Sequence, residues 1–276
     1  MKKLFLIVVF SYTFIMGLAA EGKKEEIQTM KVIRPVIENM EYLEYGVYQG
    51  GEKTSIFRVV TEIGSKVNRV YYQQILLGDF IQEIPEDYHD YGALIVTDSQ
   101  TGHMKEYHCN WESLIKSNDF TGTTKTDLVI DKTTGEIVYT QVIWDGFEEK
   151  SMVFRQSMEE NLPVFGLNTL GFDNLRYFDI LAGGTAYITI PDMVADPILG
   201  SVSVDKEELI ETPIGNFDTY KLIFYPGNSF MRRLLGPLGR ALIVWVEKGE
   251  KQRTIKFFIP GSNQTFILEK AGLWSN

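Results

Sequence analysis

The chain has 276 residues and a formal net charge of −10, and 44% of its residues are hydrophobic and 13% aromatic. This apolar content excludes a disordered chain, and the length allows one large domain or two small ones with a substantial core. The acidic balance argues against nucleic acid as a partner and against docking on anionic lipid through a basic patch, because both need positive charge. Cys109 is the only cysteine, so no disulfide can form within the chain. We expect it to be a small buried hydrophobic residue and not an exposed reactive thiol.

The N-terminus has the pattern of a signal peptide. Two lysines follow Met1, an apolar run of h-region length extends from Leu4 to Met16, and small residues precede a cut after Ala19. An uncleaved membrane anchor is the alternative, but the run is shorter than the roughly 20 residues that span a bilayer. No cysteine stands at the cut, which disfavours a lipid-anchored protein. We therefore expect residues 1–19 to be removed on export, and the loss of two lysines takes the net charge from −10 to −12.

The exported chain is predicted to comprise a leader segment over residues 20–40 and one β-rich domain over residues 41–276. Glu21 to Gln28 is highly charged, which is typical of a solvated leader. Met30 to Met40 is a short segment of mixed apolar and polar residues around Pro35. Strand-like patterns begin only after it.

Short strands joined by turns follow one another along the domain. Tyr42 to Tyr48 and Thr54 to Ile63 flank a Gly50-Gly51 turn and are predicted to form a hairpin. The stretch from Met158 to Leu181 contains glycines and a proline, so it is predicted to be an irregular crossing without a long helix. Roughly ten or more short strands with Gly, Asp and Asn turns predict an all-β, antiparallel protein. The other predicted strands cover residues 68–77, 94–97, 104–107, 126–130, 137–144, 187–190, 201–209, 218–225, 242–247, 254–259 and 264–270.

One basic and apolar segment interrupts the acidic final third of the chain. It lies between the strands predicted at 218–225 and 242–247, and its spacing is typical of a short amphipathic helix that plugs one end of the sheet. The alternative is a lid, or a contact site for lipid head groups or a partner protein. Both interpretations stay open, and the plug is favoured because leucines at helical spacing beside a sheet are most often core. The candidate ligand-binding residues in this segment are Phe230, Arg232, Arg233, Leu234 and Leu235.

The last third of the chain also contains an ordered set of turn and strand motifs. Glu211 to Leu222 reads ETPIGNFDTYKL, and Val244 to Glu247, Arg253 to Phe257 and Phe266 to Lys270 follow it. This order resembles the bacterial envelope proteins grouped as domain-of-unknown-function family 3108 and, more distantly, the carriers of the lipoprotein-localisation system. The resemblance is best over residues 201–270 and weaker over residues 41–144. It implies a strongly curved antiparallel sheet, or half-closed barrel, with one or two short helices on a concave face that holds acyl chains in the carriers.

The sequence contains no arrangement that indicates catalysis or a bound cofactor. Its histidines are His89, His103 and His108, and the last two are an odd number of residues apart on a predicted strand, which points them to opposite faces. The motifs of serine hydrolases, dinucleotide sites and phosphate loops are missing from the sequence. Adjacent carboxylates such as Glu207-Glu208 are typical of solvated surfaces. We therefore expect a protein that is not an enzyme and that uses no metal or cofactor.

Two functions fit these patterns. The first strand carries aromatic rings on both faces, with Tyr42 and Tyr48 on one and Tyr45 on the other, so both faces need a cover. One cover is the core, and the other is a ligand, a helix plug or a partner protein. The preferred hypothesis is an exported periplasmic protein that binds an apolar or lipid-like ligand in the mouth of the sheet. The alternative is a structural or assembly protein of the cell envelope that acts through protein contacts.

The signal peptide makes a direct prediction about the mature N-terminus. The protein purified from the envelope fraction is expected to begin at Ala20, because Gly17 and Ala19 meet the small-residue requirement of the cleavage site. Mass spectrometry of the intact protein measures this. An unprocessed Met1 or a lipid-modified start would contradict it.

Overall fold

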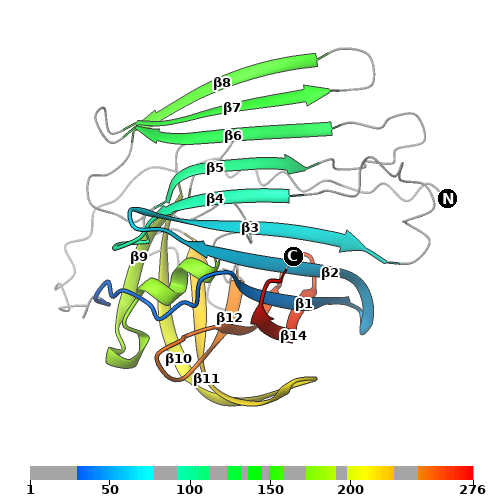
Figure 1. The fold of residues 1–276 in the computed structure, drawn as a ribbon, viewed down its shortest axis with the longest axis vertical. Coiled ribbons are helices and arrows are strands. Elements are labelled where there is room, and N and C mark those ends of the chain that lie inside the picture. The colour runs from blue at the N-terminus through cyan, green and yellow to red at the C-terminus, as the bar shows by residue number, and fades with distance from the viewer. Residues whose placement is uncertain are drawn as a thin grey trace, which may run out of the picture.

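The computed structural model describes residues 30–77, 92–102, 104–111, 123–131, 136–144, 149–157, 172–190, 198–226 and 242–275 (Figure 1). Fourteen strands and two short 3₁₀ helices contain most of these residues. The helices are η3 (Phe172–Tyr177) and η4 (Ile180–Ala182). The strands are β1 (Glu41–Gln49), β2 (Glu52–Ile63), β3 (Val67–Leu76), β4 (Gly92–Asp98), β5 (Met104–Trp111), β6 (Thr123–Asp131), β7 (Glu136–Trp144), β8 (Glu149–Ser157), β9 (Thr185–Ile190), β10 (Ile198–Thr212), β11 (Gly215–Pro226), β12 (Leu242–Glu247), β13 (Thr254–Ile259) and β14 (Gln264–Leu273).

All fourteen strands belong to one sheet, in the order β8-β7-β6-β5-β4-β3-β2-β1-β14-β13-β12-β11-β10-β9. Every neighbouring pair is antiparallel. Strands that pair in the sheet are therefore also consecutive in the chain, except β1 and β14, which are the first and last strands and pair in the middle of the sheet. The consecutive strands β8 and β9 do not pair and lie at opposite edges. The prediction of a β-dominated antiparallel fold with one or two short helices is confirmed.

Strand β8 was not among the predicted strands. It begins with Glu149 and Lys150, and such charged residues favour a solvated segment when a sequence is read locally. In the structure β8 pairs with β7 along its whole length, from Glu149 opposite Trp144 to Ser157 opposite Glu136. Residues 149–157 therefore form a strand because they pair with β7, and not because of a local sequence pattern. Strand β8 is one edge of the sheet and β9 is the other.

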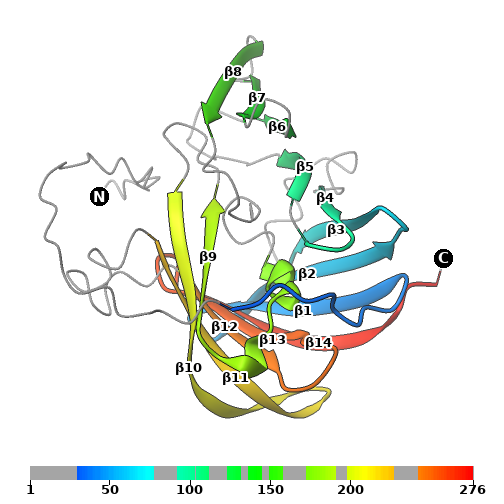
Figure 2. The ribbon, with the colours of Figure 1, turned by 90° about the vertical axis from the view of Figure 1, so that its left-hand side faces the viewer.

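The sheet is strongly curved and forms a half-closed barrel. Figure 2 shows the strands from β5 through β1 to β9 curling around the two 3₁₀ helices, with β6, β7 and β8 extending away from the curl. Strand β10 contacts both β13 and β14, although two or more strands separate them in the sheet. Five strand pairings within the curl contain a register shift, as at Val204/Lys206 and Trp245/Val246. Such bulges bend a strand, whereas the pairings from β5 to β8 keep continuous register.

The core fills the concave side of the curl. Residues directly opposite one another in successive strand pairs form an apolar row across six strands. Burial of one such side chain stabilises the fold by about 1.5 to 3 kcal/mol, so a continuous row fixes which face of each strand turns inward. The row consists of Val47, Phe266, Phe257, Val244 and Leu222, which are buried, and Val204, which is partly buried.

The outer face of β1 is covered by the chain's own charged side chains. Glu44 is 2% exposed, and its carboxylate lies 2.9 Å from Arg58 Nε and 2.7 Å from Lys270 Nζ. The Tyr42 hydroxyl donates to the same carboxylate at 2.5 Å, and the Tyr48 hydroxyl donates to the carboxylate of Glu269 at 2.7 Å. The rings on this face of β1 therefore have their cover within the chain, and the concave face is the one that turns toward the core.

The Glu44 network predicts a pH dependence of stability. Burial opposes the ionisation of Glu44, but hydrogen bonds from Lys270, Tyr42 and Arg58 outweigh it and lower its pKa from 4.5 to about 2. A carboxyl whose pKa is lowered by folding stabilises the fold above its ordinary pKa, and this contribution is lost as the pH falls from 4.5 to about 2. Glu44→Gln is therefore expected to lower the free energy of unfolding by about 2 to 3 kcal/mol at neutral pH.

Urea unfolding of the wild type and of Glu44→Gln between neutral and acidic pH measures this difference. The gap between the two proteins is expected to shrink steadily below pH 4.5. Glu211→Gln, at an exposed position on β10, is the matched control and should change little at any pH. A gap that stays constant down to strongly acid pH would show that Glu44 does not titrate as proposed.

Candidate functional site

A short plug occupies the concave side of the curled sheet. It consists of residues 172–182, which include η3 and η4, and Figure 2 shows η3 inside the curl. Its side chains form an almost continuous buried run, so the plug is part of the core and not a surface loop. The buried residues are Leu175, Arg176, Tyr177, Phe178 and Ile180, which are 0 to 4% exposed.

The plug carries a fully buried ion pair. Arg176 is 0% exposed, and both of its terminal nitrogens contact the carboxylate of Glu41 at the start of β1. Arg176 Nε also donates to the carbonyl of Lys251 at 2.9 Å, and Nη2 donates to the carbonyl of Val36 at 3.3 Å. Removal of one partner from a buried pair leaves an uncompensated charge, which costs about 3 to 5 kcal/mol. The pair therefore fixes the plug to β1 and to the turn between β12 and β13.

An N-terminal strap, residues 30–40, is hydrogen-bonded to the plug. The amide of Ile33 donates to the carbonyl of Tyr177 at 2.7 Å, and the amide of Asp179 donates to the carbonyl of Lys31 at 2.8 Å. Val32 and Phe178 form an isolated antiparallel bridge between these two bonds. The segment predicted as a leader is therefore paired with the plug from about its midpoint, and Met30 is 4% exposed.

A third contact holds the plug against the sheet. Asn68 Nδ2 donates to the Tyr177 hydroxyl oxygen at 2.6 Å. The ring of Tyr177 lies over Gly102, where an added Cβ would stand 2.3 Å from Cγ of the ring, and the φ of Gly102 is +68°. Glycine is required there because a side chain would collide with the plug and the backbone is left-handed. The turn between β4 and β5 and the start of β3 thus both contact the plug through Tyr177.

The plug lies at one end of the half-barrel, which we call the plug end. β1 begins there, β14 ends there, and the turn between β12 and β13 is also there, since Glu41 pairs with Leu273 and Arg176 reaches both Glu41 and Lys251. The turn between β1 and β2 and the turn between β13 and β14 lie at the other end, which we call the opposite end. The plug's contacts with Glu41, Lys251, Asn68 and Gly102 therefore all lie at the same end of the half-barrel.

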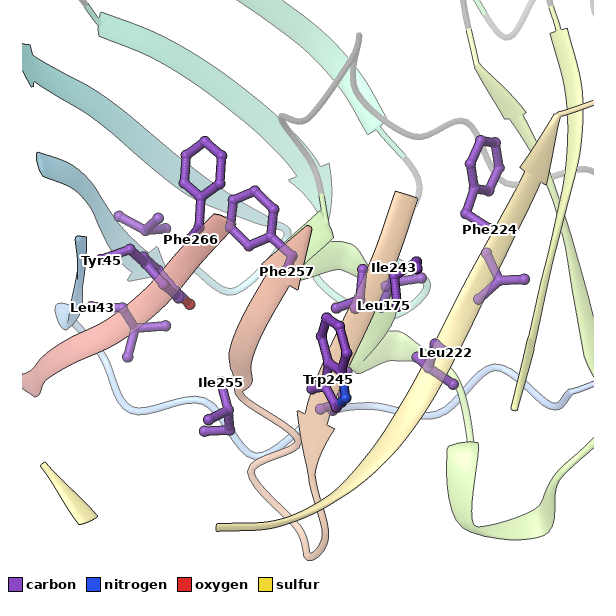
Figure 3. Close-up of a cluster of buried hydrophobic side chains, with 14 of the residues drawn as sticks. Leu43, Tyr45, Leu175, Leu222, Phe224, Ile243, Trp245, Ile255, Phe257 and Phe266 are labelled. Atoms are coloured by element: carbon purple, nitrogen blue, oxygen red, sulfur yellow. The ribbon is translucent and has the colours of Figure 1, made fainter. Parts of the chain in front are cut away.

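Five aromatic rings pack against one another in the core on the concave side, where they are 0 to 5% exposed, and we call them the aromatic floor. Phe257 and Phe266 are stacked with ring centroids 3.9 Å apart and an interplanar angle of 15°. Phe57 lies edge-on to Phe266 at 5.7 Å, and Tyr45 lies edge-on to Phe257 at 5.9 Å. Tyr72 packs on Phe57 at 5.7 Å. Figure 3 shows Tyr45, Phe257 and Phe266 projecting from neighbouring strands toward the interior.

Phe224 extends this apolar face onto β11. It is 8% exposed, and Figure 3 shows it apart from the aromatic floor, on the far side of Ile243. A Cβ added to Gly200 on β10 would lie 2.3 Å from Cε2 of the Phe224 ring. The Phe224 ring therefore occupies space that a side chain at position 200 would fill, which explains the glycine there.

The described residues hold few groups suited to catalysis. His108 lies 3.2 Å from Glu106 on β5, and both side chains are more than a third exposed. His89, His103 and the side chain of Cys109 lie outside the described residues. Within the described ranges no group of three or more His, Cys, Asp or Glu residues could hold a metal ion, and no helix is long and apolar enough to cross a membrane.

The candidate residues named from the sequence, Phe230, Arg232, Arg233, Leu234 and Leu235, lie outside the described residues. The described residues on either side of them are Pro226, at the end of β11, and Leu242, at the start of β12.

Sequence analysis missed Arg176 and Glu41. The available signal was an arginine within the mainly apolar stretch Leu175 to Ile180, but this stretch also contains Asp179, and two charges among apolar residues also fit an exposed amphipathic turn. Only the partner at Glu41, 135 residues away, makes the arginine a core residue.

Comparison with known proteins gives fold-level neighbours. No family model matches the chain, so the resemblance to domain-of-unknown-function family 3108 stays a prediction. No curated protein matches either. Among solved structures, the chain is similar to a beta-barrel-like protein of domain of unknown function DUF1849 from Brucella abortus, with 9% identity and a TM-score of 0.48 over 90% of this chain and 100% of that chain.

Two further solved structures resemble the chain more weakly. One is a provisionally described exported protein with a YmcC-like fold from Bacteroides fragilis, with 8% identity and a TM-score of 0.32 over 88% of this chain and 100% of that chain. The other is a provisionally described lipoprotein from Parabacteroides distasonis, with 10% identity and a TM-score of 0.30 over 87% of this chain and 99% of that chain.

The buried ion pair predicts a strong non-additive effect on stability. Arg176→Met is expected to lower the free energy of unfolding by about 3 to 5 kcal/mol, because it leaves the Glu41 carboxylate buried without its partner. Arg176→Met combined with Glu41→Leu should cost clearly less than the sum of the two single changes, since no unpaired charge then remains. Urea unfolding of the two single variants and the double variant measures the coupling. Strictly additive effects would contradict a direct pair.

Proposed function

We propose that the protein holds an apolar, lipid-like ligand against the aromatic floor, without changing the ligand chemically. The observation that supports the proposal is the floor itself, five rings that pack together on the concave side of the half-barrel and are 0 to 5% exposed. A ligand would reach these rings by displacing the side chains that cover them. Sites for apolar small molecules are concave and lined mainly by hydrophobic and aromatic side chains, and barrel mouths are common places for them.

The charges near the floor favour a ligand whose bound part is uncharged. Arg176 and Glu41 satisfy each other inside the protein, and Arg176's other donors are directed at backbone carbonyls. The Tyr45 hydroxyl donates to the carbonyl of Thr254 at 2.9 Å. Because these polar groups are used within the chain, the floor offers dispersion contacts and burial, which suit an acyl chain or another flat apolar group.

The same proposal includes an exported, periplasmic location. It rests on the signal-peptide pattern of residues 1–19 and on the acidic exported chain. In that compartment a non-enzymatic carrier or receptor of lipid-like molecules would bind its ligand from the opposite end, because the plug blocks the other one.

A structural or assembly role in the cell envelope is the second candidate, and the sheet edges favour it. Within the described part of the chain, β8 and β9 each pair with one strand only. An edge strand presents backbone donors and acceptors to which a partner's strand can be added. In this case the concave face would be core alone, and the edges would carry the function.

Substitution of Gly200 separates these two functions. Gly200→Ala is expected to displace the Phe224 ring, because the new methyl group would stand 2.3 Å from it, and so to change the shape of the concave face. We expect the affinity for a dansylated fatty acid to fall about tenfold, the cost of a misfit of one methyl group in a packed site. Fluorescence titration of the purified protein measures this, and organic extraction of the untreated protein followed by mass spectrometry looks for the natural ligand.

Gly272→Ala is the matched control, since an added Cβ at Gly272 meets nothing within 4 Å. It should leave fatty-acid binding unchanged. Equal binding by the wild type, Gly200→Ala and Gly272→Ala, together with an extract free of lipid, would rule out the ligand site and favour the edge-mediated role.

A further inference from the structure

The strap and the plug, which are hydrogen-bonded to each other, both carry exposed large apolar side chains. Val32 is 44% exposed, Val36 is 48% exposed, and Leu181 in η4 is 59% exposed. The amide of Asp179 donates to the carbonyl of Lys31, and the amide of Met30 donates to the carbonyl of Thr185. Leu181 lies between Asp179 and Thr185 in the chain. The three side chains therefore belong to two segments that are paired with each other. We call Val32, Val36 and Leu181 the strap patch.

The far end of the strap continues toward two more exposed apolar residues. The amide of Trp274 donates to the carbonyl of Met40 at 2.8 Å, and Trp274 is 39% exposed. Leu273 beside it is 60% exposed. An indole ring that is partly exposed next to aliphatic side chains is typical of the boundary between water and a bilayer.

Basic residues alternate with the strap patch. Lys31 and Arg34 are exposed and flank Val32, whereas residues 30–37 contain no acidic residue. The next acidic residue, Glu38, is neutralised by Lys251, whose Nζ lies 2.8 Å from its carboxylate. Residues 30–37 thus carry only positive charge in a chain whose net charge is −10, although Asp179 of the plug lies beside Lys31.

Local charge decides contact at short range even when the whole protein is acidic. At physiological ionic strength the Debye length is about 8 Å, so charges farther away than this are largely screened. Exposed lysine and arginine next to an anionic lipid surface each contribute favourably within that distance, and their long side chains can reach head groups while neighbouring apolar side chains enter the interface. The net charge of the whole chain therefore does not decide whether this patch can contact an anionic surface.

We propose that the strap patch docks on the anionic surface of a phospholipid bilayer, with Val32, Val36 and Leu181 entering the interface and Lys31 and Arg34 binding lipid phosphates. Anionic lipid is favoured over a protein partner because the patch consists of separate aliphatic side chains between flexible cations, without a buried aromatic pocket of the kind that dominates protein interfaces. The inference does not depend on the ligand proposed for the concave face.

Co-sedimentation with vesicles tests the docking. The processed protein, with its N-terminus verified by mass spectrometry, is mixed with vesicles of phosphatidylethanolamine and phosphatidylglycerol, and in parallel with vesicles of phosphatidylcholine. The wild type is expected to bind the anionic vesicles and to be released by salt. Val32→Ser, Val36→Ser and Leu181→Ser combined should weaken binding at least about tenfold, because three half-exposed apolar side chains no longer enter the interface.

Two further variants keep the result interpretable. Val153→Ser, on edge strand β8, removes an apolar side chain that is 60% exposed but lies outside the strap patch, and it should bind vesicles like the wild type. Lys31→Glu combined with Arg34→Glu changes only exposed charges and should abolish the preference for anionic vesicles. The melting temperature of each variant is expected to match that of the wild type, because every substituted side chain is at least 44% exposed or, for the two cations, exposed on the strap.

The proposal is overturned if the wild type does not sediment with anionic vesicles, or if the triple variant binds as tightly as the wild type. It is also overturned if Val153→Ser loses as much binding as the triple variant, which would mean that any exposed apolar residue contributes equally. A concentration-dependent dimer that disappears in the triple variant, without vesicle binding by the wild type, would assign the patch to a protein interface instead.

Discussion

The pairing of Arg176 with Glu41 is the constraint on which the rest of this structure depends. The two residues are 135 positions apart, and the arginine is fully buried. A buried guanidinium is tolerated only where an anion and backbone acceptors surround it. Burial of the plug therefore requires three partners of Arg176, which are Glu41 at the start of β1, the carbonyl of Val36 in the strap and the carbonyl of Lys251 in the β12–β13 turn. The plug in turn contributes buried side chains to the core on the concave side of the half-closed barrel.

The same constraint makes the fold strongly non-local. β1 and β14, the first and last strands of the domain, pair in the middle of the sheet, so the core is complete only when both ends of the chain are present. Proteins dominated by such long-range pairings fold slowly, because loop closure is required before the contacts stabilise. The local hairpins on either side form first in this view, and the plug and the β1–β14 pair join the two halves.

The parts of the fold that depend on local chemistry were predictable from the sequence. The hairpin of β1 and β2 follows from a Gly50-Gly51 turn, whose φ angles of 63° and 90° suit glycine, and the alternation Leu43, Tyr45 and Val47 identifies one buried face. The parts that depend on distant partners were not predictable. Strand β8 forms because β7 pairs with it. Glu44 is buried because Arg58 and Lys270 reach it from two other strands. The plug is buried because Glu41 neutralises its arginine. A charged residue in an apolar run carries no local mark of whether a partner exists.

The structure separates the two ends of the half-barrel. At one end the plug is held by an ion pair, a strap and the Asn68–Tyr177 hydrogen bond, and beyond it the concave face is lined with stacked rings. The strap that rests on the plug is also the cationic, apolar segment at the surface, and Val32 is the bridge partner of Phe178. The strap is therefore in direct backbone contact with the plug.

Native mass spectrometry of the processed protein, isolated from its own envelope without detergent, tests the central claim most directly. A protein that holds a lipid-like molecule on the aromatic floor will show a mass excess under native conditions that disappears on denaturation, and Gly200→Ala will reduce the occupied fraction. Identical native and denatured masses for the wild type would contradict the account, because a floor that carries no ligand in its own compartment is core and not a binding site.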